Sequence, residues 1–161
     1  MRWIAFCAVL AVSHVATAGE LRGKVVSIAD GDTITILDPD KVQHKIRLQG
    51  IDAPEKKQAF GTKSKELLTE KIAGHQVVIE WKEKDRYGRI LGEVMLGRRH
   101  INLEMVQEGM AWHYVQYSKS KELERAELQA RQARRGLWAD KDPIPPWEFR
   151  KAAKVKAASV E

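Results

Sequence analysis

Short β-rich segments joined by turn signals are the feature that most restricts the fold of this chain. Val42, His44, Ile46 and Leu48 alternate with polar residues, and this period of two predicts a strand with one buried face. Asp30-Gly31 is typical of a hairpin turn between two such segments. The segments with strand-like patterns cover residues 24–28, 33–37, 42–48, 77–81 and 90–96.

Helical spacing of apolar residues occurs in three places. Phe60–Ile72 is followed by Gly74, a short helix capped by Asn102 is expected to reach Met110, and Leu123–Leu137 forms an apolar stripe. Five strands, with a helix between the third and fourth and helices after the fifth, match the OB-fold. We therefore predict an α+β protein with a five-stranded Greek-key β-barrel and three helices.

The two ends of the chain differ in composition from its centre. Residues 1–18 combine Arg2, an apolar run and Ala16-Thr17-Ala18, which predicts a signal peptide cleaved after Ala18. The apolar run is too short to cross a bilayer, which takes about 20 residues. We expect one OB-fold domain over residues 19–140 and a proline-containing, partly disordered tail over residues 141–161.

Charge and cysteine content narrow the chemistry. The sequence has 28 Lys and Arg against 22 Asp and Glu, so loss of Arg2 with the leader leaves 27 − 22 = +5, which is compatible with a nucleic-acid partner. Cys7 is the sole cysteine, so the mature chain is expected to have no disulfide, thiolate metal site or cysteine nucleophile. The histidines show no paired spacing typical of a zinc hydrolase.

Carboxylates and isolated arginines recur at three separated places. Asp30 and Asp32 flank a turn, Asp52 and Glu55 flank Ala53-Pro54, and Arg47 and Arg89 belong to strand segments. Each place has a simpler explanation, namely turn formation, a helix N-terminus or a solvated strand face. Together they fit phosphodiester hydrolysis, because carboxylates bind a hard cation and guanidinium groups bind phosphate in a bidentate manner.

Three ordered motifs resemble the thermonuclease family, which includes staphylococcal nuclease, over about Gly23 to Trp138. They are Asp30-Gly31-Asp32-Thr33, Arg47 to Glu55, and Asp85-Arg86-Tyr87-Gly88-Arg89, followed by Gly136-Leu137-Trp138. The resemblance implies an OB-fold nuclease that uses Ca²⁺ to hydrolyse DNA and RNA. It also implies 3′-phosphate and 5′-hydroxyl products.

The same resemblance assigns roles to individual residues. Asp32, Asp52 and the carbonyl of Ala53 would bind Ca²⁺, and Asp30 would contact these ligands without binding the ion itself. Glu55 would act as general base, and Arg47 and Arg89 would bind the phosphate. The nucleotide pocket would contain Arg86, Tyr87 and one of the two residues Tyr114 and Tyr117, which the local alignment does not separate.

Two departures from the best-known member concern this site. Ala53 replaces a threonine, which matters little if only the carbonyl binds the metal, and the loop after Glu55 is shorter. The sequence thus predicts an exported, periplasmic or secreted nuclease, monomeric and without a membrane span in its mature form. The alternatives are a non-catalytic OB-fold module that binds single-stranded nucleic acid and an envelope scaffold protein that binds neither metal nor DNA.

Overall fold

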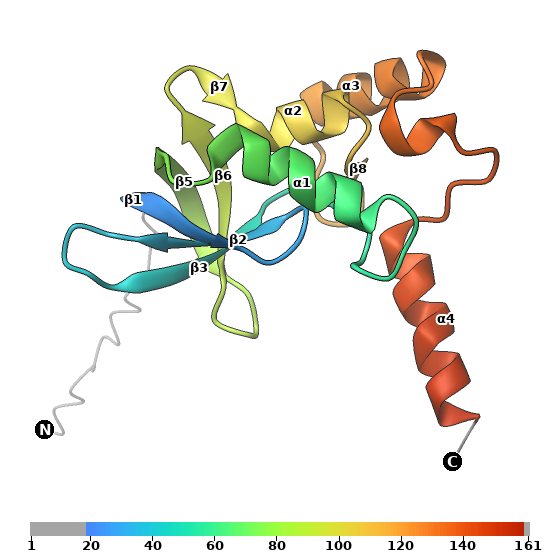
Figure 1. Ribbon diagram of the computed structural model, residues 1–161, viewed down its shortest axis with the longest axis horizontal. Helices are drawn as coiled ribbons and strands as arrows, with labels where there is room; N and C mark the ends of the chain where they lie inside the picture. Colours follow the sequence, from blue (N-terminus) through green and yellow to red (C-terminus); the bar gives the residue numbers. More distant parts are fainter. Residues whose placement is uncertain (1–18, 160–161) are drawn as a thin grey trace, which may run out of the picture.

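The computed structural model describes residues 19–159, and its centre is a closed β-barrel (Figure 1). Hydrogen bonding runs in the order β3-β2-β1-β5-β6, and a parallel pairing between β3 and β6 closes the ring. The barrel strands are β1 (Gly19–Ile28), β2 (Thr33–Leu37), β3 (Gln43–Leu48), β5 (Gln76–Lys84) and β6 (Ile90–Leu96). The predicted α+β OB-fold barrel is confirmed.

Three short strands stand at the margins of the barrel. β7 (Arg99–His100) extends the sheet beyond β6. β4 (Ile51–Asp52) pairs antiparallel with β8 (Trp112–His113). This second pairing fixes the chain just after β3, where Asp52 lies.

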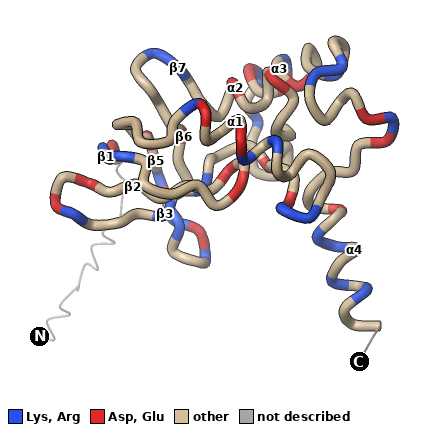
Figure 2. Tube along the Cα trace, viewed as in Figure 1, with Lys and Arg blue, Asp and Glu red and all other residues tan. Residues whose placement is uncertain are grey.

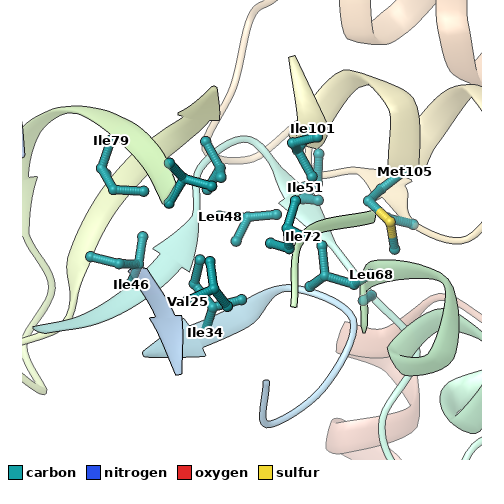
Figure 3. Packing of buried hydrophobic residues seen from close by; sticks show 14 of the residues in the cluster. Val25, Ile34, Ile46, Leu48, Ile51, Leu68, Ile72, Ile79, Ile101 and Met105 are labelled. Carbon is teal, nitrogen blue, oxygen red and sulfur yellow. The ribbon is translucent and has the colours of Figure 1, made fainter. Parts of the chain in front are cut away.

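The barrel interior is filled by branched aliphatic side chains (Figure 3). Ile34, Ile46 and Ile79 from the strands are at most 1% exposed. Leu68 and Ile72 of α1 (Gly61–Ile72) close one side of this core. Alternation along β3 places Ile46 and Leu48 inside the barrel, so Arg47 between them lies on the opposite face, as the sequence predicted.

Residues 19–159 contain four α-helices, one more than the three expected. Besides α1 they are α2 (Ile101–Gln107), α3 (Lys121–Gln132) and α4 (Pro146–Ala158), and a 3₁₀ turn covers Gly136–Ala139. Figure 1 shows α1, α2 and α3 on one side of the barrel. None of the helices within residues 19–159 combines the length and apolarity that crossing a bilayer requires.

The expected N-cap of α2 was wrong. The helix begins at Ile101, and Asn102 is buried inside it. The Asn102 side chain accepts a hydrogen bond from the Val94 amide at 3.0 Å and donates to the carbonyls of Gln49 and Gly92 at 3.0 and 3.1 Å. Asn102 thus joins the helix to β6 and to the turn after β3 instead of capping the helix.

The C-terminal segment also differs from the expectation of irregular structure. Pro145 and Pro146 begin α4 rather than end regular structure, because proline is compatible with the first turn of a helix, where no backbone donor is needed. The helix projects away from the barrel, and its N-terminal end lies beside the loop that precedes α1 (Figure 1). The predicted signal peptide, residues 1–18, lies outside the described residues, and the boundary at residue 140 stays a prediction.

Candidate active site

Asp32 is buried at the end of the β1–β2 hairpin. Its Oδ1 accepts the Thr33 hydroxyl at 3.1 Å, and its Oδ2 accepts the Ala53 backbone amide at 2.6 Å. Gly31 makes this approach possible, because a Cβ there would collide with Ser64 of α1 and with Ala53. The hairpin is therefore packed directly against the loop that carries the second pair of acids.

Asp30 contributes to the turn itself. Its Oδ1 accepts the Asp32 backbone amide at 3.1 Å, a side-chain turn of the kind that aspartate commonly forms. This hydrogen bond orients the backbone of Asp32. The supporting role of Asp30 at a metal site stays a prediction.

Arg47 bridges the two buried acids. Its Nη2 lies 2.8 Å from Asp52 Oδ1 and 3.1 Å from Asp32 Oδ2. Its Nη1 donates to the carbonyls of Leu48 and Ile51, both at 2.9 Å. The guanidinium is thus held by charged partners and by backbone acceptors, with its side chain only 13% exposed.

Negative charge is concentrated here with incomplete compensation. Burial raises the pKa of Asp32 to about 7, the charges of Asp30 and Asp52 act in the same direction, and Arg47 opposes them. A buried cluster of acids whose charge is only partly compensated by arginine would gain from a further cation. The site therefore has the electrostatic character of a cation-binding site.

The donor set suits a hard divalent cation. Asp32 and Asp52 offer carboxylate oxygens, and the carbonyl of Ala53 follows directly in the chain. Within residues 19–159 no group of three or more His, Cys, Asp or Glu side chains is arranged to hold a metal. Two carboxylates and a carbonyl, each giving one oxygen, leave about half or more of a calcium shell of 6–8 oxygens for water and substrate.

Glu55 lies on the loop between β4 and α1. Its backbone amide donates to Gln58 Oε1 at 3.1 Å, and its carbonyl accepts the Gln58 amide at 2.8 Å, forming a tight turn. Gly61 permits the first turn of α1 to touch the Glu55 carbonyl, where a Cβ would clash. The backbone of Glu55 is well fixed, while its side chain is 39% exposed.

Arg150 of α4 reaches this site from the far end of the chain. Its Nη1 donates to Glu55 Oε1 at 2.7 Å, and its Nη2 donates to Asp52 Oδ2 at 2.8 Å. Sequence reasoning missed this residue and assigned its segment to a tail. An arginine one turn after Pro-Pro-Trp in a basic segment gave no local sign that it would meet acids 95 and 98 positions away.

Arg89 lies at the base of the β5–β6 hairpin. Its Nε donates to Asp85 Oδ2 at 2.7 Å. In the parallel β3–β6 pair Arg47 is opposite Leu91, so Arg89 precedes the pairing partner of Arg47 by two residues. Among the described residues no partner is found for its terminal nitrogens, which leaves them available to an anion.

Exposed aromatic side chains accompany these arginines. The guanidinium carbon of Arg86 lies 5.0 Å from the Tyr87 ring centroid, and that of Arg89 lies 5.7 Å from it. Tyr87 is 69% exposed. The hairpin tip therefore presents arginine and tyrosine side chains together at the surface.

The two candidate pocket tyrosines lie edge to face, with centroids 4.7 Å apart. Tyr114 stacks on Trp147 of α4 at 5.2 Å, whereas Tyr117 is largely exposed. Burial, then the charge of Asp52, raises the pKa of the Tyr114 hydroxyl. Tyr114 is thus the tyrosine closer to the acids, and Tyr117 offers the freer ring face.

Comparison with known proteins agrees with this geometry. A family model for staphylococcal nuclease homologues matches residues 45–140 of the 161, more than half of the chain. This protein belongs to the staphylococcal nuclease family. The match covers Arg47, Asp52, Glu55 and Arg89, and it ends before α4.

Similar proteins include named nucleases. The chain is 45% identical over 132 residues to an uncharacterized endonuclease of Escherichia coli, covering 81% of this chain and 86% of that protein. It is 41% identical over 165 residues to the micrococcal nuclease of Shigella flexneri, covering 96% and 94% of the two chains. The staphylococcal-like nuclease CAN1 of Arabidopsis thaliana is 41% identical over 107 residues, covering 66% of this chain and 33% of its own.

Family membership supports a nuclease activity and nucleic-acid substrates for this protein. Nucleases of this family are generally calcium-dependent. The predicted family and enzyme class are therefore confirmed at this level. The metal, the products, the location and the roles of individual residues stay predictions.

Proposed function

We propose that this protein is an exported, calcium-dependent nuclease that hydrolyses phosphodiester bonds of DNA and RNA with little sequence preference. Its products would be 3′-phosphates and 5′-hydroxyls. The observation that carries the proposal is Arg47 bound between two buried carboxylates, with Nη2 2.8 Å from Asp52 and 3.1 Å from Asp32. This arrangement supports the proposal because carboxylates suited to a divalent cation and a guanidinium suited to a phosphate lie in contact.

Asp32, Asp52 and the Ala53 carbonyl would hold the ion. Calcium bound there would neutralise a phosphoryl oxygen and lower the pKa of water at the site. Arg89, whose terminal nitrogens have no partner among the described residues, would donate to the remaining phosphoryl oxygens and stabilise the charge that grows in the transition state. Arg47 would add its positive charge and its Nε–H, because its other N–H groups are bound to Asp32, Asp52 and two backbone carbonyls. Glu55 would accept the proton of the attacking water.

The aromatic groups would bind the bases beside the scissile ester. Tyr87 and Tyr117 expose rings, and stacking on such rings tolerates any base. Arg86 beside Tyr87 would meet a neighbouring phosphate. This mode of binding is consistent with little sequence preference.

Incubation of single-stranded DNA, double-stranded DNA and RNA with the protein in calcium tests the proposal. We expect cleavage of all three and none with excess chelator, while circular dichroism shows that the fold persists. Products labelled by polynucleotide kinase without prior phosphatase would carry 5′-hydroxyl ends. Cleavage that survives chelation would remove the metal from the mechanism.

A non-catalytic single-strand-binding module is the second candidate, favoured by the exposed rings of Tyr87 and Tyr117. It predicts DNA binding without any cleavage in calcium or other divalent ions. Export is tested separately by fractionating cells and sequencing the N-terminus of the mature protein, which we expect at Gly19. Gel filtration of that mature protein tests the expected monomer.

A further inference from the structure

Helix α4 is held against the candidate site by more than one contact. Trp147 stacks on Tyr114 with an interplanar angle of 4° and meets the edge of Trp112 at 5.5 Å. The Gln58 side chain donates to the Ile144 carbonyl at 2.6 Å. The segment before α4 is therefore bonded to the loop that carries Glu55, and the first turn of α4 rests on the aromatic residues beside the acids.

This docking brings Arg150 to the acids. Trp147 and Arg150 are three positions apart, so they share one side of the helix. Figure 2 shows Lys and Arg recurring along α4. Of the described residues of α4, Arg150 is the one that forms ion pairs with Asp52 and Glu55.

The guanidinium of Arg150 joins two carboxylates with different assigned roles. Nη1 lies 2.7 Å from Glu55 Oε1 and 3.2 Å from Asp52 Oδ1, and Nη2 lies 2.8 Å from Asp52 Oδ2. Burial of the group opposes its charge, but the hydrogen bonds and charges of both acids raise the pKa of Arg150 above its usual value. Its planar fork spans both acids, which a lysine ammonium cannot reproduce.

Arg150 can keep this position when Asp52 also binds an ion. A carboxylate has about four lone-pair sites, and Asp52 accepts three N–H groups, one from Arg47 and two from Arg150. One site thus remains on the Asp52 carboxylate. Within residues 19–159, Arg150 is also the side chain that binds the carboxylate of Glu55.

We propose that Arg150 is a positioning residue that holds the carboxylate of Glu55 beside the metal ligand Asp52. Because Glu55 is otherwise free to change rotamer on a half-exposed loop, loss of this bridge would misplace the base relative to the attacking water. Misplacement of about 1 Å can cost on the order of 10² in rate. The inference rests on the proposed function of Glu55 and extends the site to a helix outside the family match.

The test compares Arg150→Ala and Arg150→Lys with Lys154→Ala. Lys154 lies one turn further along α4, is exposed and carries the same charge, so its removal controls for general loss of positive charge. Steady-state kinetics with DNA give kcat and KM, calorimetry gives the calcium Kd, and thermal melting reports stability. Added guanidinium chloride, below denaturing concentrations, tests whether the missing group can be supplied from solution.

We expect kcat of Arg150→Ala to fall on the order of 10²-fold, with KM changed by less than about threefold. The calcium Kd should stay within about tenfold of that of the unmodified protein. Arg150→Lys should recover little, guanidinium should restore part of the rate of Arg150→Ala only, and Lys154→Ala should keep the original kcat.

Several results would overturn the role of Arg150. A rise in KM with unchanged kcat would make it a phosphate-binding group instead. A calcium Kd more than about tenfold tighter in Arg150→Ala, with a faster rate, would make it a competitor of the metal. Full recovery in Arg150→Lys would show that charge alone suffices. If the unmodified protein were inactive, the proposed nuclease function itself would be wrong. Failure of the proposed function and failure of the role of Arg150 therefore give different results.

Discussion

Asp52 receives a guanidinium group from two regions of the molecule that are built differently. Arg47 comes from a barrel strand and is held also by the carbonyls of Leu48 and Ile51. Arg150 comes from a helix that projects from the barrel, and its side chain is 37% exposed against 13% for Arg47. Arg47 is thus part of the barrel, whereas the position of Arg150 depends on how α4 packs against the barrel.

This difference in burial and support predicts different contributions of Arg47 and Arg150 to stability and to rate. Arg47 compensates charge that the barrel has already buried, so its removal should affect both folding and rate. Arg150 touches the acids at the rim of the site and is anchored by stacking of Trp147, so its removal should leave the barrel intact. The predictions below use this contrast, beginning with the largest effect.

Substitution Arg47→Ala should have the largest effect. It would leave Asp32 and Asp52 buried without their shared cation, and breaking such a buried pair costs about 3–5 kcal/mol. The rate of DNA hydrolysis should fall by more than about 10³-fold. Urea unfolding and cleavage kinetics measure the two effects, and a variant with lower activity but unchanged stability would contradict the framework role.

Substitution Arg89→Ala should reduce the rate on the order of 10³-fold while changing stability little. Its Nε binds Asp85 in a pair that is still partly open to solvent, and we expect such a pair to contribute on the order of 1 kcal/mol, less than the buried pairs of Arg47. The matched control is Arg86→Ala on the same hairpin, whose loss should raise KM more than it lowers kcat. A rate loss of less than about tenfold for Arg89→Ala would argue against a phosphate-binding role.

The sequence allowed the barrel and most of the site to be predicted because the signals there are local. Period-two alternation predicted that Arg47 lies on the face of its strand opposite the core. The Asp-Gly pair predicted the hairpin turn that carries Asp32. The position of Arg150 depends on how α4 packs, which no short pattern encodes. Its helix was misread because three prolines suggested a break, whereas Pro146 begins the helix.

Substitution Trp147→Ala should have an intermediate effect that tests how α4 is anchored. It would remove the stack on Tyr114 and the contact with Trp112, and aromatic pairs contribute about 0.5–1.5 kcal/mol beyond burial. We expect a kcat loss that approaches but does not exceed that of Arg150→Ala, because the helix would hold Arg150 less firmly. Proteolysis within α4 should become faster while the barrel stays resistant. An unchanged rate of proteolysis in α4 would show that Trp147 does not anchor the helix.

The smallest predicted effect concerns Asp32, the buried acid that Arg150 does not reach. Burial raises its pKa from 3.8 to about 7 in the folded protein. Its contribution to stability is therefore complete below pH 3.8, where it is protonated in both states, and is lost as the pH rises through about 7. Without calcium, this group should therefore make the protein progressively less stable between about pH 4 and about pH 7.

Substitution Asp32→Asn should weaken this pH dependence. Melting in chelator should show the variant gaining relative to the unmodified protein as the pH rises, on the order of 1 kcal/mol or about 2–4 °C. Asp85→Asn is the control: partial burial raises the pKa of Asp85, but hydrogen bonds from Arg89 and Tyr87 lower it overall, so it stays ionised throughout this range. Calcium should remove the difference by stabilising only the protein that retains Asp32. If the melting temperatures of the variant and the unmodified protein stay parallel at every pH, the charge of Asp32 does not destabilise the fold and Arg47 compensates it fully.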